Sequence, residues 1–163
     1  MNDLIEEWKN KKNQVKQQRG RITGRLKQAP GEKLRQLADE KHEEVFSEID
    51  CLDCANCCSK IPPIVDKTDV NRIAKTLGMK VSDFQKQYTR RDADGDTVLK
   101  TVPCTFLMED NKCFIYDIRP KACRNYPHTE GYEFIGNLDL HTKNAQYCPA
   151  AYHIISRILK EVR

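Results

Sequence analysis

Apolar residues recur at helical spacing in three stretches of the chain and predict three substantial helices. Residues 2 to 27 carry a sparse stripe, and residues 32 to 49 a fuller one, with Ala29-Pro30-Gly31 as a strong break between them. The third stretch follows Pro149, which suits a first helical turn. Its apolar positions are Ala151, Ile154, Ile155, Ile158, Leu159 and Val162. The first two stretches predict a helical hairpin, and the third a C-terminal helix.

The middle of the chain has shorter apolar clusters separated by turn residues. Two short helices are expected, one beginning near Thr68 or Asp69 and ending at Gly78, and one beginning at Ser82. Asp92 to Asp96 is expected to form a turn, and residues 97 to 108 and 113 to 116 a small antiparallel hairpin around residues 109 to 112. The fold class predicted is mainly α with a small β hairpin, organised by metal.

Charge is distributed unevenly along this pattern. Residues 9 to 35 contain ten Lys or Arg and one Glu, a net charge of +9, whereas the whole chain carries +4. A basic segment of this kind can meet nucleic acid, membrane phosphate or an acidic protein. It lacks interleaved aromatic residues and any nucleic-acid motif, so an ordinary solvated helix face remains the simpler interpretation. A protein partner is not specified by the sequence, and nucleic acid is a weaker expectation.

Eight cysteines change the picture most. They are Cys51, Cys54, Cys57, Cys58, Cys104, Cys113, Cys123 and Cys148. The N-terminal residues lack the pattern of a secretory signal and no stretch approaches the length of a membrane span, so a cytoplasmic location is expected. Thiols in a reducing compartment are more often metal ligands than disulfides. The domain boundaries expected are a basic helical hairpin arm over 1–50 and a metal-binding domain over 51–163.

The cysteine spacing predicts two centres with four thiolates each. Two residues between cysteines allow a tight turn to aim both sulfurs at one centre, whereas adjacent side chains such as Cys57 and Cys58 diverge. The preferred partition places Cys51, Cys54, Cys57 and Cys148 in one centre. The other takes Cys58, Cys104, Cys113 and Cys123. Zinc and an iron–sulfur cluster suit such sites equally well.

Other side chains have weaker claims to the site. Lys112, Arg119, Lys121 and Arg124 could stabilise the negative charge of thiolate centres. His128 is near enough to Cys123 to be a spare ligand, but a solvated or core histidine is the better interpretation. His42, His141 and His153 have no ligand spacing and are assigned no metal.

The cysteine blocks together resemble the YkgJ-like cysteine-cluster family, which carries a CxxCxxCC signature and is described as zinc- or iron-chelating. The matching blocks are Cys51-x-x-Cys54-x-x-Cys57-Cys58 with Pro62-Pro63, Pro103-Cys104-x-Phe106-Leu107, Cys113-x-Ile115-Tyr116, Arg119-Pro120-x-x-Cys123-Arg124-x-Tyr126-Pro127, and Cys148-Pro149. The resemblance covers about residues 50 to 150 and implies metal binding.

Three functions remain open at this point, of which metal buffering or delivery is the weakest, because it requires labile metal and a closed site couples metal loss to unfolding. A metal-bearing binding or adaptor module would have closed sites that fix its loops. A redox or protein-modifying enzyme is the alternative, because one branch of the resembling family is similar to flagellin lysine methylases. No strand followed by a glycine-rich loop offers a pocket for a methyl donor. The adaptor is therefore the preferred interpretation, and whether the chain is an enzyme stays undecided.

Overall fold

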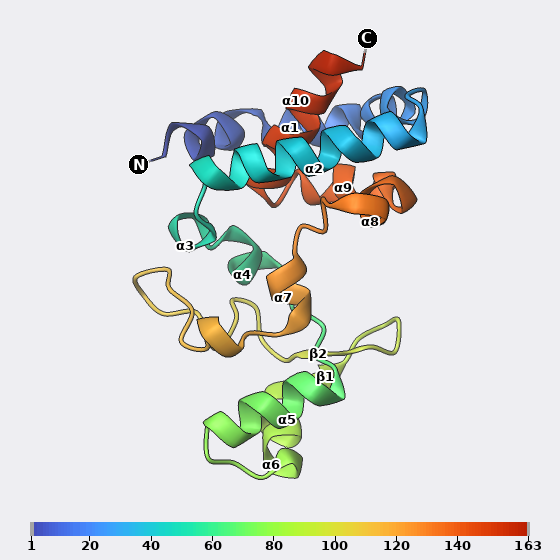
Figure 1. Cartoon of the computed structure of the whole chain (residues 1–163). Helices are drawn as coiled ribbons and strands as arrows, with labels where there is room; N and C mark the ends of the chain where they lie inside the picture. The colour runs from blue at the N-terminus through green and yellow to red at the C-terminus, as the bar shows by residue number, and fades with distance from the viewer. Residues whose placement is uncertain (1, 163) are drawn as a thin grey trace. The chain divides into compact units, whose positions relative to one another are not determined.

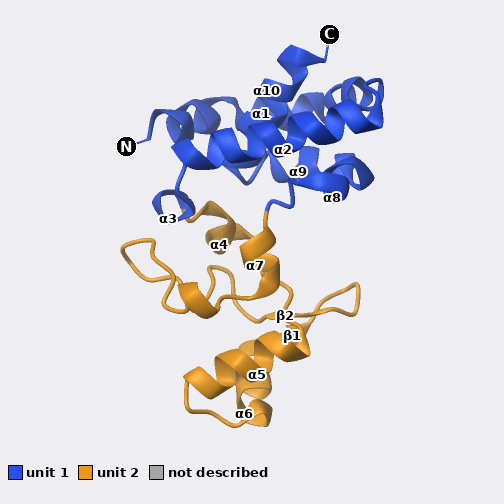
Figure 2. Ribbon diagram, viewed as in Figure 1, with its two compact units in different colours: residues 1–54, 127–163 blue, residues 55–126 orange. Residues whose placement is uncertain are grey.

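The computed structural model describes residues 2–162 and is mainly α-helical, with one small antiparallel sheet. The predicted fold class is confirmed. The chain divides into two compact units, one of residues 1–54 and 127–163 and one of residues 55–126 (Figure 2). The second unit is therefore inserted between two helical parts of the first. Within the described residues, every helix is too short or too polar to cross a membrane.

The first unit is built almost entirely of helices (Figure 1). They are α1 (Asp3–Lys27), α2 (Gly31–Glu48), α3 (Cys51–Cys54), α8 (Gly131–Gly136), α9 (Leu138–Asn144) and α10 (Pro149–Glu161). Helix α1 packs against α9 and α10, and α2 packs against α8 and α10. The predicted hairpin thus shares one core with the C-terminal helices.

Local sequence explains where the long helices begin and end. The side chain of Asn2 caps α1 by accepting a hydrogen bond from the backbone N–H of Leu4 at 2.9 Å. Pro30 precedes α2, and Pro149 occupies the first turn of α10. The sparse apolar stripe of α1 is buried, and Trp8 donates its indole N–H to the carbonyl of Ala145 at 2.9 Å. The three predicted long helices are confirmed.

Two of the three other helices of the first unit, α8 and α9, had no clear signal in the sequence. Helices α8 and α9 bury apolar Phe134 and Leu138, but α9 also buries His141, Thr142 and Asn144. Buried polar residues disrupt the apolar periodicity by which an amphipathic helix is recognised. The pattern alone therefore could not indicate these elements.

The second unit combines short helices, two short strands and long irregular loops (Figure 1). Its elements are α4 (Asn56–Lys60), α5 (Lys67–Thr76), α6 (Val81–Tyr88), β1 (Thr89–Arg91), β2 (Thr97–Leu99), the 3-10 helix η1 (Tyr116–Ile118) and α7 (Lys121–Asn125). Its small core contains Val65, Val70, Ile73, Ala74, Phe84, Leu99, Phe106 and Ile115. Cys104 and Cys113 pack against this core.

The hairpin forms earlier in the chain than its predicted position. Strands β1 and β2 pair with Thr89 opposite Leu99, across the acidic turn, whose Asp92 carboxylate accepts the N–H groups of Asp94 and Asp96. At the predicted position, Leu107 and Cys113 form only an isolated antiparallel β-bridge. The 3-10 turn beginning at Tyr116 ends the extended backbone there, so the ladder cannot lengthen.

The two short middle helices also begin earlier than predicted. The N-cap of α5 is Asp66, not Thr68 or Asp69, and that of α6 is Lys80, not Ser82. Asp66 accepts the N–H of Asp69, and Asp69 accepts the N–H of Asp66, which is the reciprocal arrangement of a capping box. Asp69 is therefore the third residue of the helix rather than its cap.

Candidate metal centres

Four of the predicted ligands, Cys58, Cys104, Cys113 and Cys123, belong to the second unit and come from separate segments. Cys58 lies in α4, Cys123 in α7, and the other two in the loop between β2 and η1. The backbone N–H of Cys104 donates to the carbonyl of Cys58 at 2.8 Å. The N–H of Leu107 donates to the carbonyl of Cys104 at 3.0 Å, and Leu107 is bridged to Cys113. Backbone hydrogen bonds thus bring three of the four segments together.

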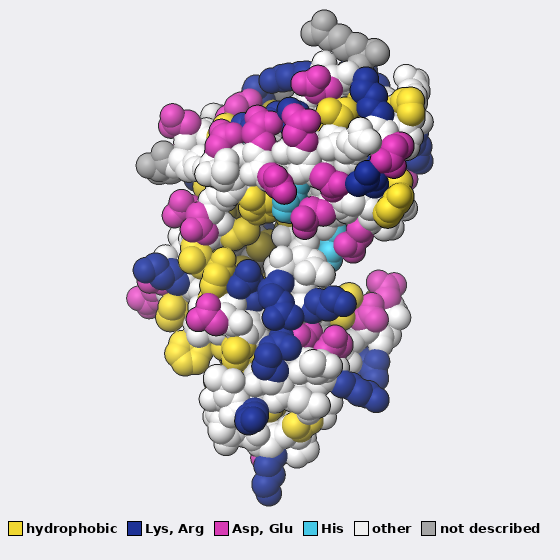
Figure 3. All heavy atoms as spheres, in the orientation of Figure 1, with side chains coloured by type: hydrophobic (Ala, Val, Ile, Leu, Met, Phe, Trp, Pro, Cys, Tyr) yellow, Lys and Arg dark blue, Asp and Glu magenta, His cyan; other side chains and the backbone are white. Residues whose placement is uncertain are grey.

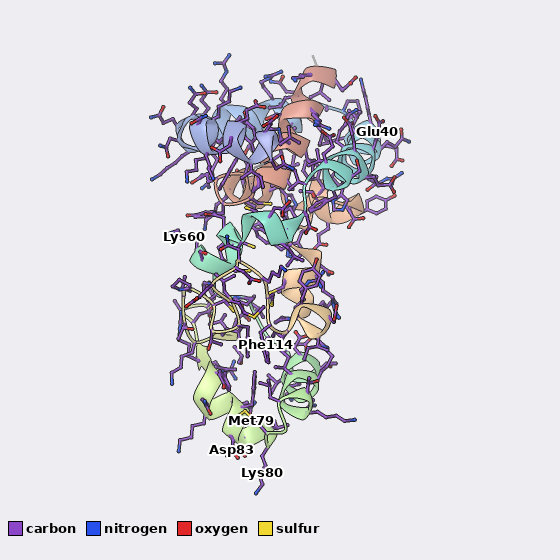
Figure 4. All side chains as sticks on the ribbon, turned by 90° about the vertical axis from the view of Figure 1, so that its left-hand side faces the viewer. Glu40, Lys60, Met79, Lys80, Asp83 and Phe114 are labelled. Carbon is purple, nitrogen blue, oxygen red and sulfur yellow. The ribbon has the colours of Figure 1, made fainter. Side chains whose placement is uncertain are left out.

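Two aromatic residues orient the loop that carries Cys113. The N–H of Phe114 donates to the carbonyl of Phe106 at 2.8 Å. Phe106 and Ile115 are buried, whereas Phe114, labelled in Figure 4, is 66% exposed. This alternation fixes the loop on the small core from both sides of Cys113. The position of Cys113 is therefore determined by packing of its neighbours.

A buried carboxylate holds the segment that leads to Cys123. Asp69 is 2% exposed, and one of its oxygens accepts from Arg72 and from the backbone N–H of Lys121 at 3.1 Å. Arg72 also donates to the carbonyl of Ile118 at 3.2 Å and to that of Arg119 at 3.0 Å. These bonds join α5 to the start of α7. Sequence analysis gave Asp69 only a capping role and missed Arg72, because an Asp and an Arg three residues apart are common in helices.

Electrostatic interactions show that the four thiols lie within reach of one another. Burial, together with smaller upward contributions from Cys58, Cys104 and Cys113, raises the pKa of Cys123 to about 12. Burial also raises the pKa of Cys104, to which Cys58 and Cys113 add. Cys58 is the exception, since a hydrogen bond from the side chain of Cys57 lowers its pKa to about 7. Cys58 is thus the thiol of this set most readily converted to the thiolate that binds metal.

Positive side chains surround this set. Arg119 lowers the pKa of both Cys113 and Cys123 through its charge, although burial outweighs it. Its guanidinium lies 3.9 Å from the ring centre of Tyr116 and donates to the Tyr116 carbonyl at 2.6 Å, so it is held in place. On the face shown in Figure 3, Lys and Arg side chains gather over the second unit near α7. Such cations suit a centre that carries net negative charge.

The first unit contains a second group of thiols, Cys51, Cys54 and Cys148. Cys51 and Cys54 are the end residues of α3, and Cys148 is the N-cap of α10, where its sulfur accepts the N–H of Ala151 at 3.5 Å. Burial, together with the smaller effects of the charges of Cys51 and Cys54, raises the pKa of Cys148 to about 12. The three thiols therefore share one environment.

Cys58, Cys104, Cys113 and Cys123 belong to the second unit, and Cys51, Cys54 and Cys148 belong to the first. Cys57, the eighth, belongs to the second unit, while the three thiols with which it was grouped belong to the first. Within residues 2–162, no three His, Cys, Asp or Glu side chains are already gathered closely enough to hold an ion. Ligation by any of the eight cysteines therefore stays a prediction. Cys58, Cys104, Cys113, Cys123 and Cys148 are present as free thiols.

The histidines have contacts of their own in the first unit. His128 lies 3.1 Å from a carboxylate oxygen of Glu133, and His42 lies 2.9 Å from the hydroxyl of Thr129. His141 has Phe134 stacked on its ring and carbonyl oxygens near both nitrogens. His153 donates from Nε2 to the carbonyl of Leu4 at 2.8 Å. These contacts place the histidines in the packing of the helices.

The donor set consists of sulfur atoms, which narrows the chemistry that the sites can support. Thiolates prefer zinc, copper(I) and iron–sulfur clusters over magnesium or calcium. Four sulfurs from separate segments, with cations beside them, fit a tetrahedral zinc site or a cubane cluster equally well. The class of protein that this arrangement defines is a helical protein with cysteine-rich loops.

Comparison with known proteins gives the family. Residues 50–149 match the model of the family described as "CxxCxxCC: Putative zinc- or iron-chelating domain", and the chain belongs to that family. A relative, "Uncharacterized protein MJ0661" of Methanocaldococcus jannaschii, is 35% identical over 82 residues, which is 48% of this chain and 44% of the relative. The chain thus spans less than half the length of that relative. No solved structure matches.

Proposed function

We propose that this chain is a metal-binding module of the cytoplasm whose cysteine centres fix the loops of the second unit into a surface for a protein partner. Membership of the zinc- or iron-chelating family supports metal binding as such. The module role, the location and the ligands go beyond that membership. Four thiols per centre complete a tetrahedral shell and leave no open position for a substrate. A closed site favours a structural module over an enzyme.

The observation that carries the proposal is the grouping of Cys58, Cys104, Cys113 and Cys123 within one unit. Residues 100–126 bury only Phe106, Ile115 and Pro120, which is little apolar area for a segment of that length. Nevertheless, four thiols from separate segments of this unit are brought within electrostatic reach of one another. Binding a cation would draw the sulfurs together and release protons, so metal affinity would supply folding free energy.

Cys51, Cys54 and Cys148 are proposed as ligands of a separate centre in the first unit. Their grouping follows from the shared environment around Cys148. The assignment of Cys57 to this centre rests on its spacing in the sequence alone. The two centres can be distinguished experimentally, because replacing one thiol of a centre should remove the metal of that centre only.

The metal itself is open between zinc and an iron–sulfur cluster, and one preparation distinguishes them. The protein is purified without oxygen, and its visible spectrum, metal content and acid-labile sulfide are measured. Colourless protein with about two zinc ions per chain supports the module. Brown protein with iron and sulfide instead supports the alternative of a redox or protein-modifying enzyme, since a cluster can accept electrons. Metal-free protein with ordered cysteine loops would contradict the proposal.

The partition is tested by replacing one thiol of each group. In Cys104→Ser the metal of the second unit should be lost, and in Cys148→Ser that of the first, so each variant retains about half the metal. The double variant should retain almost none. If both single variants lose the same metal, identified by its spectrum, the division into two centres is wrong. Circular dichroism at 222 nm provides the control that the helical unit still folds.

The basic helix α1 is the candidate for contact with a charged partner. Two of its cations are paired with acids of the same helix. Lys9 contacts Glu6 at 2.8 Å, and Lys11 contacts Glu7 at 2.8 Å. Acidic side chains gather over α2 on the face shown in Figure 3, within the same unit. This internal pairing argues for a protein partner rather than nucleic acid. Binding of an oligonucleotide that weakens steeply as salt rises would overturn that preference, because phosphate contacts release counterions.

A further inference from the structure

Helices α1 and α10 border a hollow of about 290 Å³ in the first unit, away from any residue discussed as a metal ligand. Its lining residues come from α1 and α10, together with Ala145. They are Lys11, Gln14, Val15, Gln18, Arg21, Ile22, Arg25, Ala145, Tyr152, Ile155, Ser156 and Leu159. Three of them are cations and none is an acid. The charged side chains that line the hollow are thus all basic, whereas the rest of this unit carries both signs of charge.

The cations are not equally available to a ligand. Lys11 is paired with Glu7 at 2.8 Å, and Arg25 donates to the carbonyl of Leu159 at 2.9 Å, which holds its guanidinium across the end of α10. Arg21 has no ion pair or hydrogen bond with any residue from 2 to 162. Its position, one helical turn before Arg25, places both arginines on the same side of α1. Two guanidinium groups can grip a phosphate or carboxylate through paired N–H bonds.

The hydroxyl of Tyr152 adds a second feature. Tyr152 is 9% exposed and lines the hollow, and within residues 2–162 its hydroxyl makes no hydrogen bond. The oxygen itself is not fully buried, so the hydroxyl is available to donate to a ligand in the hollow. It lines the hollow together with Lys11. Gln14, Gln18 and Ser156 provide further donors around the rim.

The walls between these polar groups are apolar. Val15, Ile22 and Leu159 line the hollow beside the ring of Tyr152. A free inorganic ion would leave those walls in contact with water, whereas an apolar group attached to the anion would cover them. Ligand pockets commonly combine such walls with a few polar groups that set orientation.

We propose that this hollow binds a phosphate monoester with a small apolar body, the phosphate held by Arg21, Arg25 and the hydroxyl of Tyr152. The apolar body lies on Val15, Ile22 and Leu159. The proposal does not depend on the metal centres, because no cysteine lines the hollow. It assigns the first unit a binding site of its own, in addition to any role as a partner surface.

The test uses the full metal-loaded chain and four probes, which are phenyl phosphate, inorganic phosphate, benzoate and benzyl alcohol. Affinities are measured by calorimetry, and binding is located by amide NMR shifts on α1 and α10. Phenyl phosphate should bind at least about tenfold more tightly than benzyl alcohol, which lacks charge, and about threefold more tightly than inorganic phosphate, which lacks the ring. Tighter binding of benzoate than of phenyl phosphate would mean that the hollow prefers carboxylates, and would overturn the proposed phosphate specificity.

Two variants and a control complete the experiment. Arg21→Gln should weaken phenyl phosphate about fivefold, and Tyr152→Phe, which removes only the hydroxyl, about threefold. Lys33→Gln makes the same charge change at an exposed side chain of α2, outside the hollow. It should leave the affinity for phenyl phosphate within about 1.5-fold of that of the unchanged chain. Equal weakening by Arg21→Gln and Lys33→Gln would mean diffuse attraction to a positive protein, and would overturn the site. Shifts confined to residues outside α1 and α10 would overturn it as well.

Discussion

The helical unit and the inserted cysteine-rich unit achieve order in different ways. In the first unit, Trp8, Leu26 and Phe134 are almost completely buried between long helices. In the second, the small core gathers on α5, α6 and the hairpin, and the loops from residue 100 to 126 contribute few buried apolar side chains. What the loops do contain is three of the four grouped thiols. Apolar burial therefore stabilises the first unit, and we expect the loops of the second to depend on cross-linking by bound metal.

Metal removal should produce the largest difference in stability between the two units. After chelation under reducing conditions, amide hydrogen exchange in residues 104–126 should accelerate at least about a hundredfold, because binding free energy in such sites is also folding free energy. Exchange in the central turns of α1 and α2 should change less than about threefold. Equal loss of protection in both units would break the comparison, since it would make metal the support of the helical core too.

Truncation of Trp8 should destabilise the first unit rather than the cysteine loops of the second. Trp8→Ala removes a side chain that is 1% exposed and its hydrogen bond to Ala145, and should cost about 3–5 kcal/mol of unfolding free energy. Denaturant unfolding followed by circular dichroism measures the loss, and the metal content should be unchanged. Tyr132→Ala, at a position 73% exposed, should cost less than about 1 kcal/mol. Loss of the metal of the second unit in Trp8→Ala would show that the units are not independent.

The buried Asp69 tests how protein contacts position the cysteine loops. Asp69→Asn weakens the bonds to Arg72 and Lys121, and should cost about 1–3 kcal/mol and lower the metal affinity of the second unit. Cobalt substitution followed by its visible thiolate bands gives the affinity. Asp83→Asn, labelled in Figure 4 and exposed on α6 of the same unit, makes the same change in charge and should have no effect. Equal effects of both variants would exclude a specific role for the Asp69 contacts.

Acid should weaken the first unit through its buried histidines. Burial lowers the pKa of His153 from its ordinary value of 6.5, although Glu7 and Glu48 oppose this and Arg157 adds to it. The unfolded chain therefore takes up the proton first, so stability is fully present above pH 6.5 and falls as the pH drops through the folded-state pKa. Urea unfolding at pH 7.5, 6.5, 5.5 and 5.0 measures the trend.

His153→Gln retains an N–H donor for Leu4 and removes the titrating group. The fall of stability below pH 6.5 should be smaller in this variant, with the remainder due in part to His141, whose pKa burial also lowers. An unchanged pH dependence in the variant would exclude His153 as a source. Metal content should be recorded at each pH, because protonation of thiolates also releases metal.

The sequence was most informative where structure depends on nearby residues. Helices α1, α2 and α10 follow from apolar spacing, from the break at Pro30 and from Pro149. It was less informative where apolar periodicity is weak or turn geometry decides. The strands pair across the Asp92–Asp96 turn because side-chain bonds from Asp92 close it, and this depends on turn geometry rather than on apolar alternation. Helix α9 was missed because its buried face includes polar side chains.

By itself, the sequence determined the family, the mainly helical class and the set of eight cysteines as candidate ligands. Only the tertiary structure decided which thiols share an environment, since Cys58 and Cys123 are brought into reach by backbone bonds and by Asp69, which no spacing rule contains. It also decided that residues after Pro127 complete the core of the N-terminal hairpin. The reason is physical: helix formation is governed by residues within a few positions of each other, whereas a core or an ion site is assembled from residues remote in the chain.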